Sequence, residues 1–402
     1  MIDAGRLWQR LMALAEIGDT GDGGVNRQAL TEGEIAAWRL LIGWAEAAGM
    51  RAATDDVGNL FLTRPGSDGS LPPLLLGSHV DTQPTGGKFD GAFGVLAALE
   101  ATMVLPEPTR DVTVVAWMNE EGSRFAPGMM GSEVFAGVRG LAEVRAARDA
   151  AGVSVGAALD ALHGAFPTLP RLPLGFAAHA YLEPHIEQGP LLEQAGAVIG
   201  VVSGIQGKIT WEMVVQGEEG HAGTLDLALR KDALARFAAM AHAMHQAAAA
   251  EDAALKFTIG QVNLVPNAPS VVPGRVVFRI DLRHPENAVL ESFARRLETL
   301  AREHAAPCTV AIRRMVEAPS NGFDAGLQAR IAAAANAIGA AAMPILSAAG
   351  HDARHMASRC PSAMIFIPCR GGVSHSPLEW AEPAHVAAGA EVLARVAAAL
   401  AA

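Results

Sequence analysis

Apolar, strand-like runs alternate with segments of helical spacing through the first and last parts of the chain. The runs that predict strands are 57–63, 74–78, 112–118, 197–203 and 363–367, and the helical segments are 32–48, 92–103 and 383–401. Strands that alternate with helices in this way form a largely parallel sheet with helices on both faces. We therefore expect a three-layer α/β domain.

The middle of the chain has a different order of elements. It reads as strand 209–216, helix 228–249, strands 256–264 and 275–283, helix 287–301 and strand 307–314. The order β-α-β-β-α-β is that of a ferredoxin-like unit, which buries one face of its sheet under two helices. A chain of 402 residues is also long enough for two cores. We therefore predict a small domain at 206–317, inserted into a discontinuous larger domain formed by 1–205 and 318–402.

Composition excludes several classes of partner. The net charge of −11 and the scattered 31 Lys and Arg residues disfavour nucleic acid, which requires a basic face.

The most apolar stretch, 331–350, is broken by Asn336, Gly339 and Pro344, so it predicts a buried helix, turn and strand rather than a membrane span. The amphipathic N-terminus has no cleavage site and predicts no signal peptide. Three cysteines without paired spacing indicate a cytoplasmic protein whose metal ligands are histidines and carboxylates.

Five segments place a histidine or a carboxylate next to glycine at the end of an expected strand or in the loop after it. Their candidate ligands are His79, Asp90, Glu121, His185 and His375. Ligand sites of open α/β sheets lie at that edge. Each segment alone is compatible with an ordinary hydrogen-bonded histidine or a solvated carboxylate. Together they supply about the set that two divalent ions sharing one bridging carboxylate require.

Two further carboxylates accompany this set. Glu120 directly precedes Glu121, and two adjacent carboxylates at the end of an apolar strand favour one ligand and one base. Asp81 lies two residues after His79, so in an extended segment the two side chains point the same way. Asp81 is therefore suited to orient the imidazole.

With these motifs the chain resembles the hydantoinase/carbamoylase family of zinc amidohydrolases, which is related to two-zinc exopeptidases. The resemblance covers nearly the whole chain. The motifs that carry it are 23–27, 56–60, 77–87, 119–125, 185–190, 220–224, 350–353 and 373–377. His351 and Asp352 belong to one of these motifs, but no role for them follows from it.

The resemblance implies a set of ligands. One zinc would be held by His79, Asp90 and His185, and the other by Asp90, Glu121 and His375. Glu120 would be the general base, and Asp81 would orient His79. The related exopeptidases typically carry a carboxylate at the position of His185, so this histidine favours the amidohydrolase branch.

The resemblance also gives the inserted domain the roles of lid and homodimer interface. His221 would reach across the dimer to stabilise the developing oxyanion, Gln188 would contact the substrate, and Arg283 would clamp a substrate carboxylate. A turn histidine and a surface arginine are the alternatives. This chain departs from the family at Ser270, where asparagine is common, and at 225–227, where Leu-Asp-Leu replaces Thr-Pro-Met. Both departures concern the substrate rather than the reaction.

The implied reaction is hydrolysis of a linear amide C–N bond, with an N-carbamoyl-L-amino acid giving the amino acid, ammonia and carbon dioxide. A hydroxide bridging two metal ions would attack, and Glu120 would serve as the base. Zinc is the expected metal, and manganese, cobalt or nickel would suit the same ligands. The alternative substrates are allantoate and N-carbamoyl-β-alanine. The alternative classes are a two-zinc exopeptidase or N-acyl amino acid deacylase, and a catalytically silent ligand-binding protein.

Overall fold

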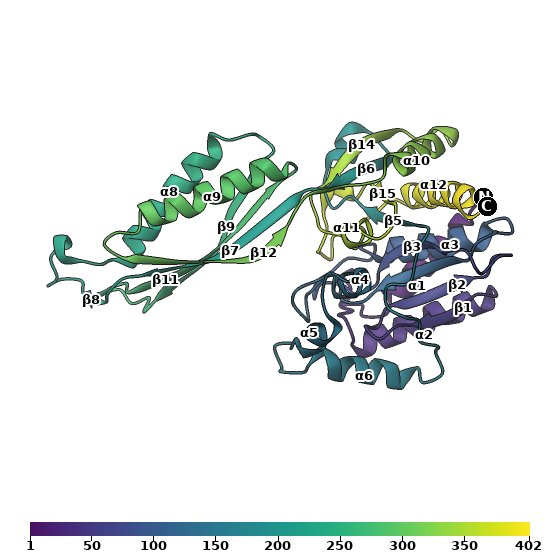
Figure 1. The fold of residues 1–402 in the computed structure, drawn as a ribbon, viewed down its shortest axis with the longest axis horizontal. Helices are drawn as coiled ribbons and strands as arrows, with labels where there is room; N and C mark the ends of the chain where they lie inside the picture. The colour runs from purple at the N-terminus through teal and green to yellow at the C-terminus, as the bar shows by residue number, and fades with distance from the viewer. The chain divides into compact units, whose positions relative to one another are not determined.

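The computed structural model describes residues 1–402 and divides them into two compact units (Figure 1). One unit comprises Met1–Gly204 and Gly322–Ala402, and the other comprises Ile205–Asn321.

The first unit contains most of the helices and a large sheet. Its helices are α1 (Ala4–Ala15), α2 (Glu32–Ala47), α3 (Ala92–Val104), α4 (Met130–Ala136), α5 (Leu141–Ala146), α6 (Val155–Ala165), α7 (Leu191–Ala195), α10 (Ala325–Ala337), α11 (Ala353–Met356) and α12 (Pro383–Ala401), with a 3₁₀ turn η2 (Arg370–Gly372). Its strands are β1 (Arg51–Thr54), β2 (Leu60–Arg64), β3 (Leu74–His79), β4 (Val112–Trp117), β5 (Ala180–Ile186), β6 (Ile199–Ile205), β13 (Asn321–Gly322), β14 (Ala342–Ser347) and β15 (Ser362–Ile367).

The sheet runs in the order β1-β2-β4-β3-β5-β15-β6-β13, with β14 beside β6. The four central strands β4, β3, β5 and β15 are parallel, whereas β2 and β6 pair antiparallel on either side of them. Every residue of these four strands is buried, as expected for parallel strands covered on both faces. The predicted α/β sheet is thus confirmed, with antiparallel strands at its edges. Parallel strands end at the same side, so the residues after β3, β4, β5 and β15 meet there.

Helix α3 covers the centre of this sheet and is buried from Ala92 to Thr102. It packs against β3 on one side and against α12 on the other. Helix α12 is long and apolar enough to span a membrane by length and composition, but half of it is buried against neighbouring elements. The core helix of a water-soluble protein has this same character.

Strand β5 lies at the centre of the sheet, and the sequence pattern does not predict it. It carries Glu183, Pro184 and His185, which interrupt the apolar run by which a buried strand is identified. All three residues are nevertheless buried, because the strand lies between β3 and β15 in the middle of the sheet.

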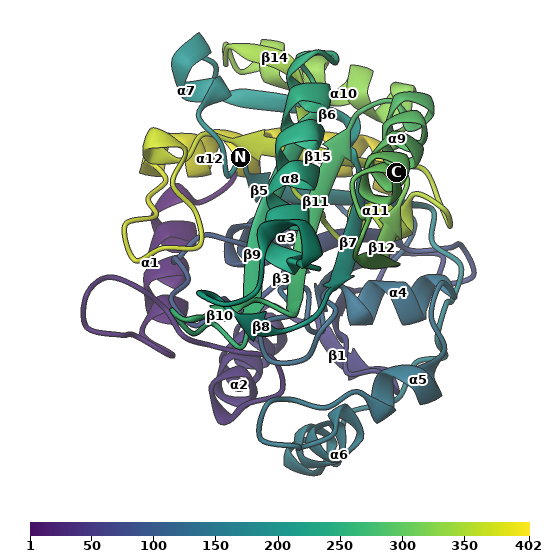
Figure 2. The same cartoon turned by 90° about the vertical axis from the view of Figure 1, so that its left-hand side faces the viewer.

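The second unit is built on a four-stranded antiparallel sheet in the order β12-β7-β11-β9 (Figures 1 and 2). Its elements are β7 (Gly207–Gln216), β8 (Gly220–His221), η1 (Leu227–Leu229), α8 (Ala233–Ala249), β9 (Lys256–Val265), β10 (Val271–Val272), β11 (Arg275–His284), α9 (Asn287–Glu303) and β12 (Thr309–Ala318). Helices α8 and α9 pack on one face of the sheet around Trp211, Phe278 and Phe293. The predicted ferredoxin-like order of elements is confirmed.

Helix α8 begins five residues later than the sequence pattern indicates. Asp232 caps it, because its carboxylate accepts a hydrogen bond from the amide of Ala235 at 3.0 Å. The apolar residues Leu227 and Leu229 therefore belong to a separate 3₁₀ turn and are largely exposed.

Candidate metal centre

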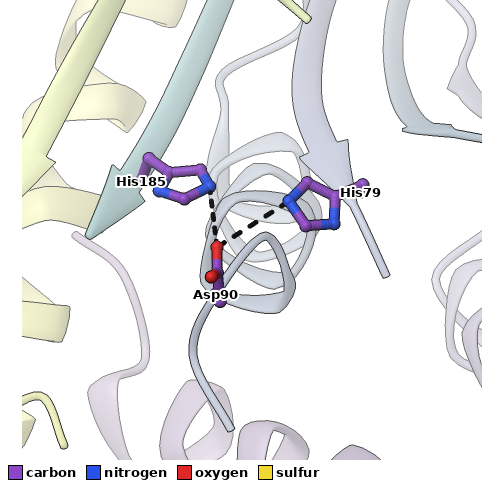
Figure 3. Close-up of side chains that lie close together, drawn as sticks. All are labelled: His79, Asp90 and His185. Atoms are coloured by element: carbon purple, nitrogen blue, oxygen red, sulfur yellow. Dashed lines mark ion pairs between the residues drawn. The ribbon is translucent and has the colours of Figure 1, made fainter. Parts of the chain in front are cut away.

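The candidate ligands of the first unit converge where the parallel strands end. His79 closes β3, His185 is the penultimate residue of β5, and Asp90 lies in the loop between β3 and α3 (Figure 3). Glu121 follows β4 and His375 follows β15. The sequence places these residues up to about 300 positions apart, and the sheet topology brings them together.

The first group is His79, Asp90 and His185. The Nε2 atoms of His79 and His185 lie 3.8 Å and 3.2 Å from Oδ1 of Asp90 (Figure 3). Both rings are oriented by backbone carbonyls: Nδ1 of His79 is 3.0 Å from the oxygen of Asp81, and Nδ1 of His185 is 2.9 Å from that of Ile186. A carbonyl oxygen accepts a hydrogen bond, so in the neutral ring each Nδ1 carries the hydrogen and each Nε2 presents a lone pair to the group.

The second group is Asp90, Glu121 and His375. Nε2 of His375 lies 3.1 Å from Oδ2 of Asp90 and 3.3 Å from Oε2 of Glu121. Asp90 therefore faces one group with each of its two oxygens. His375 has a positive φ of 53° and a side chain that is 47% exposed, whereas the side chains of the other candidate ligands are 1 to 5% exposed.

The residues present fit a pair of metal ions. Two ligands of one tetrahedral zinc ion lie about 3.3 Å apart, and the four distances within the two groups are 3.1 to 3.8 Å. Three buried polar atoms without a hydrogen-bond partner lie here, namely Nε2 of His185, Oε1 of Glu121 and Oε1 of Gln188. Such atoms are rare in folded proteins unless an ion or ligand satisfies them.

A third cluster of possible ligands, Glu183, His185 and His351, does not have this character. Both oxygens of Glu183 already accept hydrogen bonds, one from the hydroxyl of Ser78 and the other from the hydroxyl of Tyr181 and the amide of Ala353. Protein donors thus satisfy this carboxylate, and it holds β5 to its neighbours.

Glu120 lies beside both groups without belonging to either. Its Oε2 is 3.6 Å from Nε2 of His79, and its side chain is only 10% exposed. Burial raises the pKa of Glu120 well above its ordinary value, and the charges of Asp352 and Glu121 add to the rise. A carboxyl with a raised pKa and a free edge toward the metal groups is suited to take up a proton.

The side chain of Asp81 contacts the backbone of Glu120 and Glu121 in addition to the ring of His79. Its two carboxylate oxygens accept hydrogen bonds from the amides of Glu120 and Glu121, each at 3.1 Å, and thereby hold the turn that carries both glutamates. Its contact with Nδ1 of His79 is longer, at 3.6 Å, than that of its own backbone oxygen. The orientation of His79 that the sequence assigns to the Asp81 side chain is made chiefly by the Asp81 main chain.

The electrostatics of the two groups differ. Burial alone would lower the pKa of His79, but the carboxylates of Glu120, Asp81 and Asp90 outweigh it and raise that pKa. Burial lowers the pKa of His185 to about 4, so this imidazole is neutral at physiological pH. The hydrogen bond to Asp90 raises the pKa of His375 to about 9.

These values predict that metal binding releases protons. His375 is a cation below pH 9 in the protein stripped of metal, and a metal ion requires the neutral imidazole. We expect about one proton per protein to be released at pH 7 when an ion binds to the group of Asp90, Glu121 and His375, and the affinity for this ion to rise with pH up to about 9. Calorimetric metal titrations in phosphate and in Tris at one pH measure the released protons. A binding enthalpy that is equal in the two buffers would contradict the prediction, and His375→Ala should lower the proton count.

Several residues of the site were not identified from the sequence. Gln83 donates to Oε2 of Glu121 at 2.8 Å, and Glu379 accepts hydrogen bonds from the amides of Phe89 and Asp90. The glycine pair Gly86-Gly87 is the sequence feature that could have indicated a side chain packed closely against this loop. A Cβ on Gly87 would lie 2.1 Å from the carboxyl carbon of Glu379. Glycine is required at position 91 for a similar reason, because its φ is +64° and a Cβ there would lie 2.4 Å from the His79 ring.

The remaining predicted residues are divided between the units. Gln188, in the first unit, donates from Nε2 to Oδ2 of Asp90 at 2.9 Å. His221 and Ser270 lie together in the second unit, where β8 pairs with β10 and the amide of Ala222 donates to the Ser270 oxygen. Arg283 lies on β11 and forms a two-point ion pair with Asp281, at 2.8 and 3.2 Å.

Comparison with known proteins is consistent with this geometry. A profile of the peptidase family M20/M25/M40 matches residues 75–399. The chain is 39% identical to an N-carbamoyl-L-amino-acid amidohydrolase of Rhizobium meliloti, over 98% of this chain and 95% of that protein. It is 34% identical to an allantoate amidohydrolase of Bacillus subtilis, over 94% of this chain and 93% of that protein.

A solved structure is also similar to this chain over its full length. The crystal structure of a hydantoinase/carbamoylase family amidase from Burkholderia multivorans aligns with a TM-score of 0.90 and 38% identity, over 100% of this chain and 98% of that one. The chain therefore belongs to the peptidase family M20/M25/M40. It is a hydrolase acting on C–N bonds other than peptide bonds, from a metal-dependent family, and its two groups of His, Asp and Glu could hold the metal.

Proposed function

We propose that this enzyme hydrolyses the carbamoyl group of an N-carbamoyl-L-amino acid at a centre of two divalent ions. The observation that carries the proposal is the division of Asp90 between two ligand groups, with the buried Glu120 beside them. Similarity over almost the full chain to an N-carbamoyl-L-amino-acid amidohydrolase supports the substrate class. The three cysteines Cys308, Cys360 and Cys369 form no disulfide, which supports a cytoplasmic enzyme.

In this proposal His79, Asp90 and His185 hold one ion, and Asp90, Glu121 and His375 hold the other. When bound, such ions lower the pKa of water and polarise the carbonyl that is attacked. Zinc is the metal that this set of imidazole and carboxylate ligands favours. Manganese, cobalt or nickel would suit the same atoms.

Glu120 moves the protons of the reaction. It takes a proton from the attacking water, whose oxygen forms a bond to the carbamoyl carbon, and passes that proton to the nitrogen that leaves. Gln188 is available to the substrate, because its Nε2 is held by Asp90 while its buried Oε1 has no partner within the protein. An N–H of the carbamoyl group is a suitable donor to that oxygen.

His221 is prepared to donate a hydrogen bond. The amide of Gly223 donates to its Nδ1 at 3.0 Å, so in the neutral ring the proton resides on Nε2. Arg230 holds the same turn, because its guanidinium donates to the backbone oxygens of Leu225 and Ala222 at 2.9 and 2.7 Å. An Nε2–H on an exposed, braced turn is suited to stabilise the oxygen that becomes negative during attack.

The position of His221 within its own unit supports a homodimer. Arg283 pairs with Lys208 at the start of β7, whereas Arg275 pairs with Gln216 at its end, shortly before β8 and His221. Eight residue steps of a strand span about 27 Å. One copy therefore cannot bring both Arg283 and His221 to the same small substrate by way of this rigid sheet. Two copies could, if His221 comes from the partner and Arg283 from the protomer that binds the metal.

Mixing two inactive variants tests this arrangement. We expect His221→Ala and Glu120→Gln to be inactive alone and to regain about a quarter of wild-type activity when dissociated and reassembled together. Half of randomly assorted dimers are mixed, and each of these has one complete site. A mixture that stays inactive although mixed dimers form would show that His221 does not act across the dimer.

The substrate is tested by ammonia release from metal-loaded protein. N-carbamoyl-L-amino acids, N-carbamoyl-β-alanine, allantoate and a dipeptide are offered side by side, with a chelator-treated control. We expect chelator-sensitive ammonia release from N-carbamoyl-L-amino acids. Release from allantoate alone would identify an allantoate amidohydrolase, for which the similarity to the Bacillus subtilis protein is the supporting observation. Cleavage of the dipeptide alone would contradict the proposal.

A further inference from the structure

Glu379 is a buried carboxylate with no part in the proposed reaction. It lies in the loop between η2 and α12, four residues after His375, and is 2% exposed. A charged side chain is rarely buried in this way unless several donors hold it. Its contacts therefore indicate what the residue does.

The two oxygens of Glu379 contact two loops that carry metal-group residues. Oε1 accepts hydrogen bonds from the amides of Phe89 and Asp90 at 2.8 and 3.0 Å. Oε2 lies 3.0 Å from the hydroxyl of Ser374, and the same hydroxyl lies 3.0 Å from Oδ2 of Asp90. Ser374 directly precedes His375, so the network joins the backbone of Asp90 to the turn that carries His375.

The residues around Glu379 leave space for its carboxyl group and hold its loop against the loop of Asp90. Gly87 leaves the space for its carboxyl group, which a Cβ there would fill. Trp380, the next residue, packs against Phe89 with the two rings 5.6 Å apart at their centroids. The C-terminal loop is thus fastened to the Asp90 loop by a buried carboxylate and by an aromatic contact.

The two ligand groups depend on this fastening to different degrees. His79 and His185 belong to central strands, and each ring is hydrogen-bonded to a neighbouring backbone oxygen. His375 instead lies on a half-exposed loop with positive φ, and its position relative to Asp90 has no support from a strand. Loss of the Glu379 network should therefore disturb the pair Asp90–His375 more than the group with His79 and His185.

We infer that Glu379 is a positioning residue for the second ion: through Ser374 and the backbone of Asp90 it sets the affinity of the Asp90–Glu121–His375 group. The inference rests on the proposed binuclear centre. Partners that orient metal ligands in this way commonly change metal affinity 10- to 100-fold when they are removed.

The test is calorimetric titration of chelator-stripped protein with Co²⁺, which binds ligands of this kind and whose absorption reports its coordination. We expect the ion at Asp90, Glu121 and His375 to be the weaker of the two, because His375 lies on a half-exposed loop. For Glu379→Ala we expect this second ion to lose about 10- to 100-fold in affinity, with the first ion within about threefold of wild type. Glu379→Gln should restore the second ion, because an amide oxygen can accept from both backbone amides and its NH₂ can donate to Ser374. The matched control is Glu382→Ala, which removes an exposed carboxylate paired with Arg370 and should leave both affinities unchanged.

Equal weakening of both ions, no weakening, or a glutamine variant as weak as the alanine variant would overturn the inference. Should Glu379→Ala not fold, as judged by its thermal unfolding, Ser374→Ala decides. A loss of about tenfold confined to the second ion supports the inference, and unchanged affinities overturn it. A wild-type isotherm with fewer than two ions would instead contradict the binuclear centre itself, so the two failures are distinguishable.

Discussion

Replacing Glu120 by glutamine is expected to lower kcat by about 10²- to 10⁴-fold while both metal ions stay bound, because general base catalysis contributes that much. Glutamine has nearly the same shape but cannot accept the proton of the attacking water. Glu120 lies in neither candidate ligand group, so its loss leaves the five candidate ligands in place. Initial rates on N-carbamoyl-L-amino acids and metal content by elemental analysis check the two halves of the expectation.

The control for Glu120 is Glu143→Gln. Glu143 is an exposed carboxylate, with a side chain 65% exposed, that pairs with Arg139 on the helical surface of the same unit. Its replacement should leave kcat unchanged. A Glu120→Gln enzyme with wild-type kcat would show that another group is the base, and one that has lost its metal would make Glu120 a ligand.

Replacing Asp90 by asparagine is expected to have the second large effect, because Asp90 is the one carboxylate common to both groups. A neutral amide cannot hold two divalent ions, so metal content should fall below one ion per chain and turnover should disappear. Ligand binding at 1,000 times Kd stabilises the folded state by about 4 kcal/mol. Metal loading should therefore raise the melting temperature of the wild-type protein but not that of the variant.

Asp160→Asn is the matched control for Asp90. Asp160 is 69% exposed and pairs with Arg145 on the surface of α6, so its replacement should preserve both metal content and the thermal shift. If Asp90→Asn retained two ions and the full thermal shift, Asp90 would not be the bridging ligand. The two ions would then have to be held by separate sets of residues.

The fold was predicted from periodicity where the elements are apolar or amphipathic. Strands β3, β4 and β15 and helix α3 follow the expected ranges within a few residues, because each buries a continuous apolar run. Strand β5 was not predicted, because its buried positions include Glu183 and His185. Polar residues enter a central strand when tertiary neighbours satisfy them, here Ser78 and Tyr181, and a local pattern contains no information about such neighbours.

The site likewise combines residues that the sequence indicated with contacts that only the tertiary structure shows. The structure brings together the five candidate ligands and Glu120, each of which the sequence marks by a glycine-flanked motif at a strand end. Their roles stay predictions until metal and turnover are measured. Asp81 was expected to orient His79, yet its carboxylate chiefly holds the amides of Glu120 and Glu121. These hydrogen bonds join the loop after β3 to the loop after β4. The two-residue spacing of His79 and Asp81 in the sequence contains no information about a contact between two strands.

The sequence by itself determined the class of fold, the order of elements in the inserted unit and the residue types able to hold a metal, because these depend on local pattern and side-chain chemistry. Only the tertiary structure decided which oxygen of Asp90 faces which histidine and which carbonyls orient the imidazoles. It also decided that Glu379 joins two loops 289 positions apart. Such contacts arise where strands distant in the chain end at one side of a sheet, and their geometry depends on packing rather than on sequence spacing.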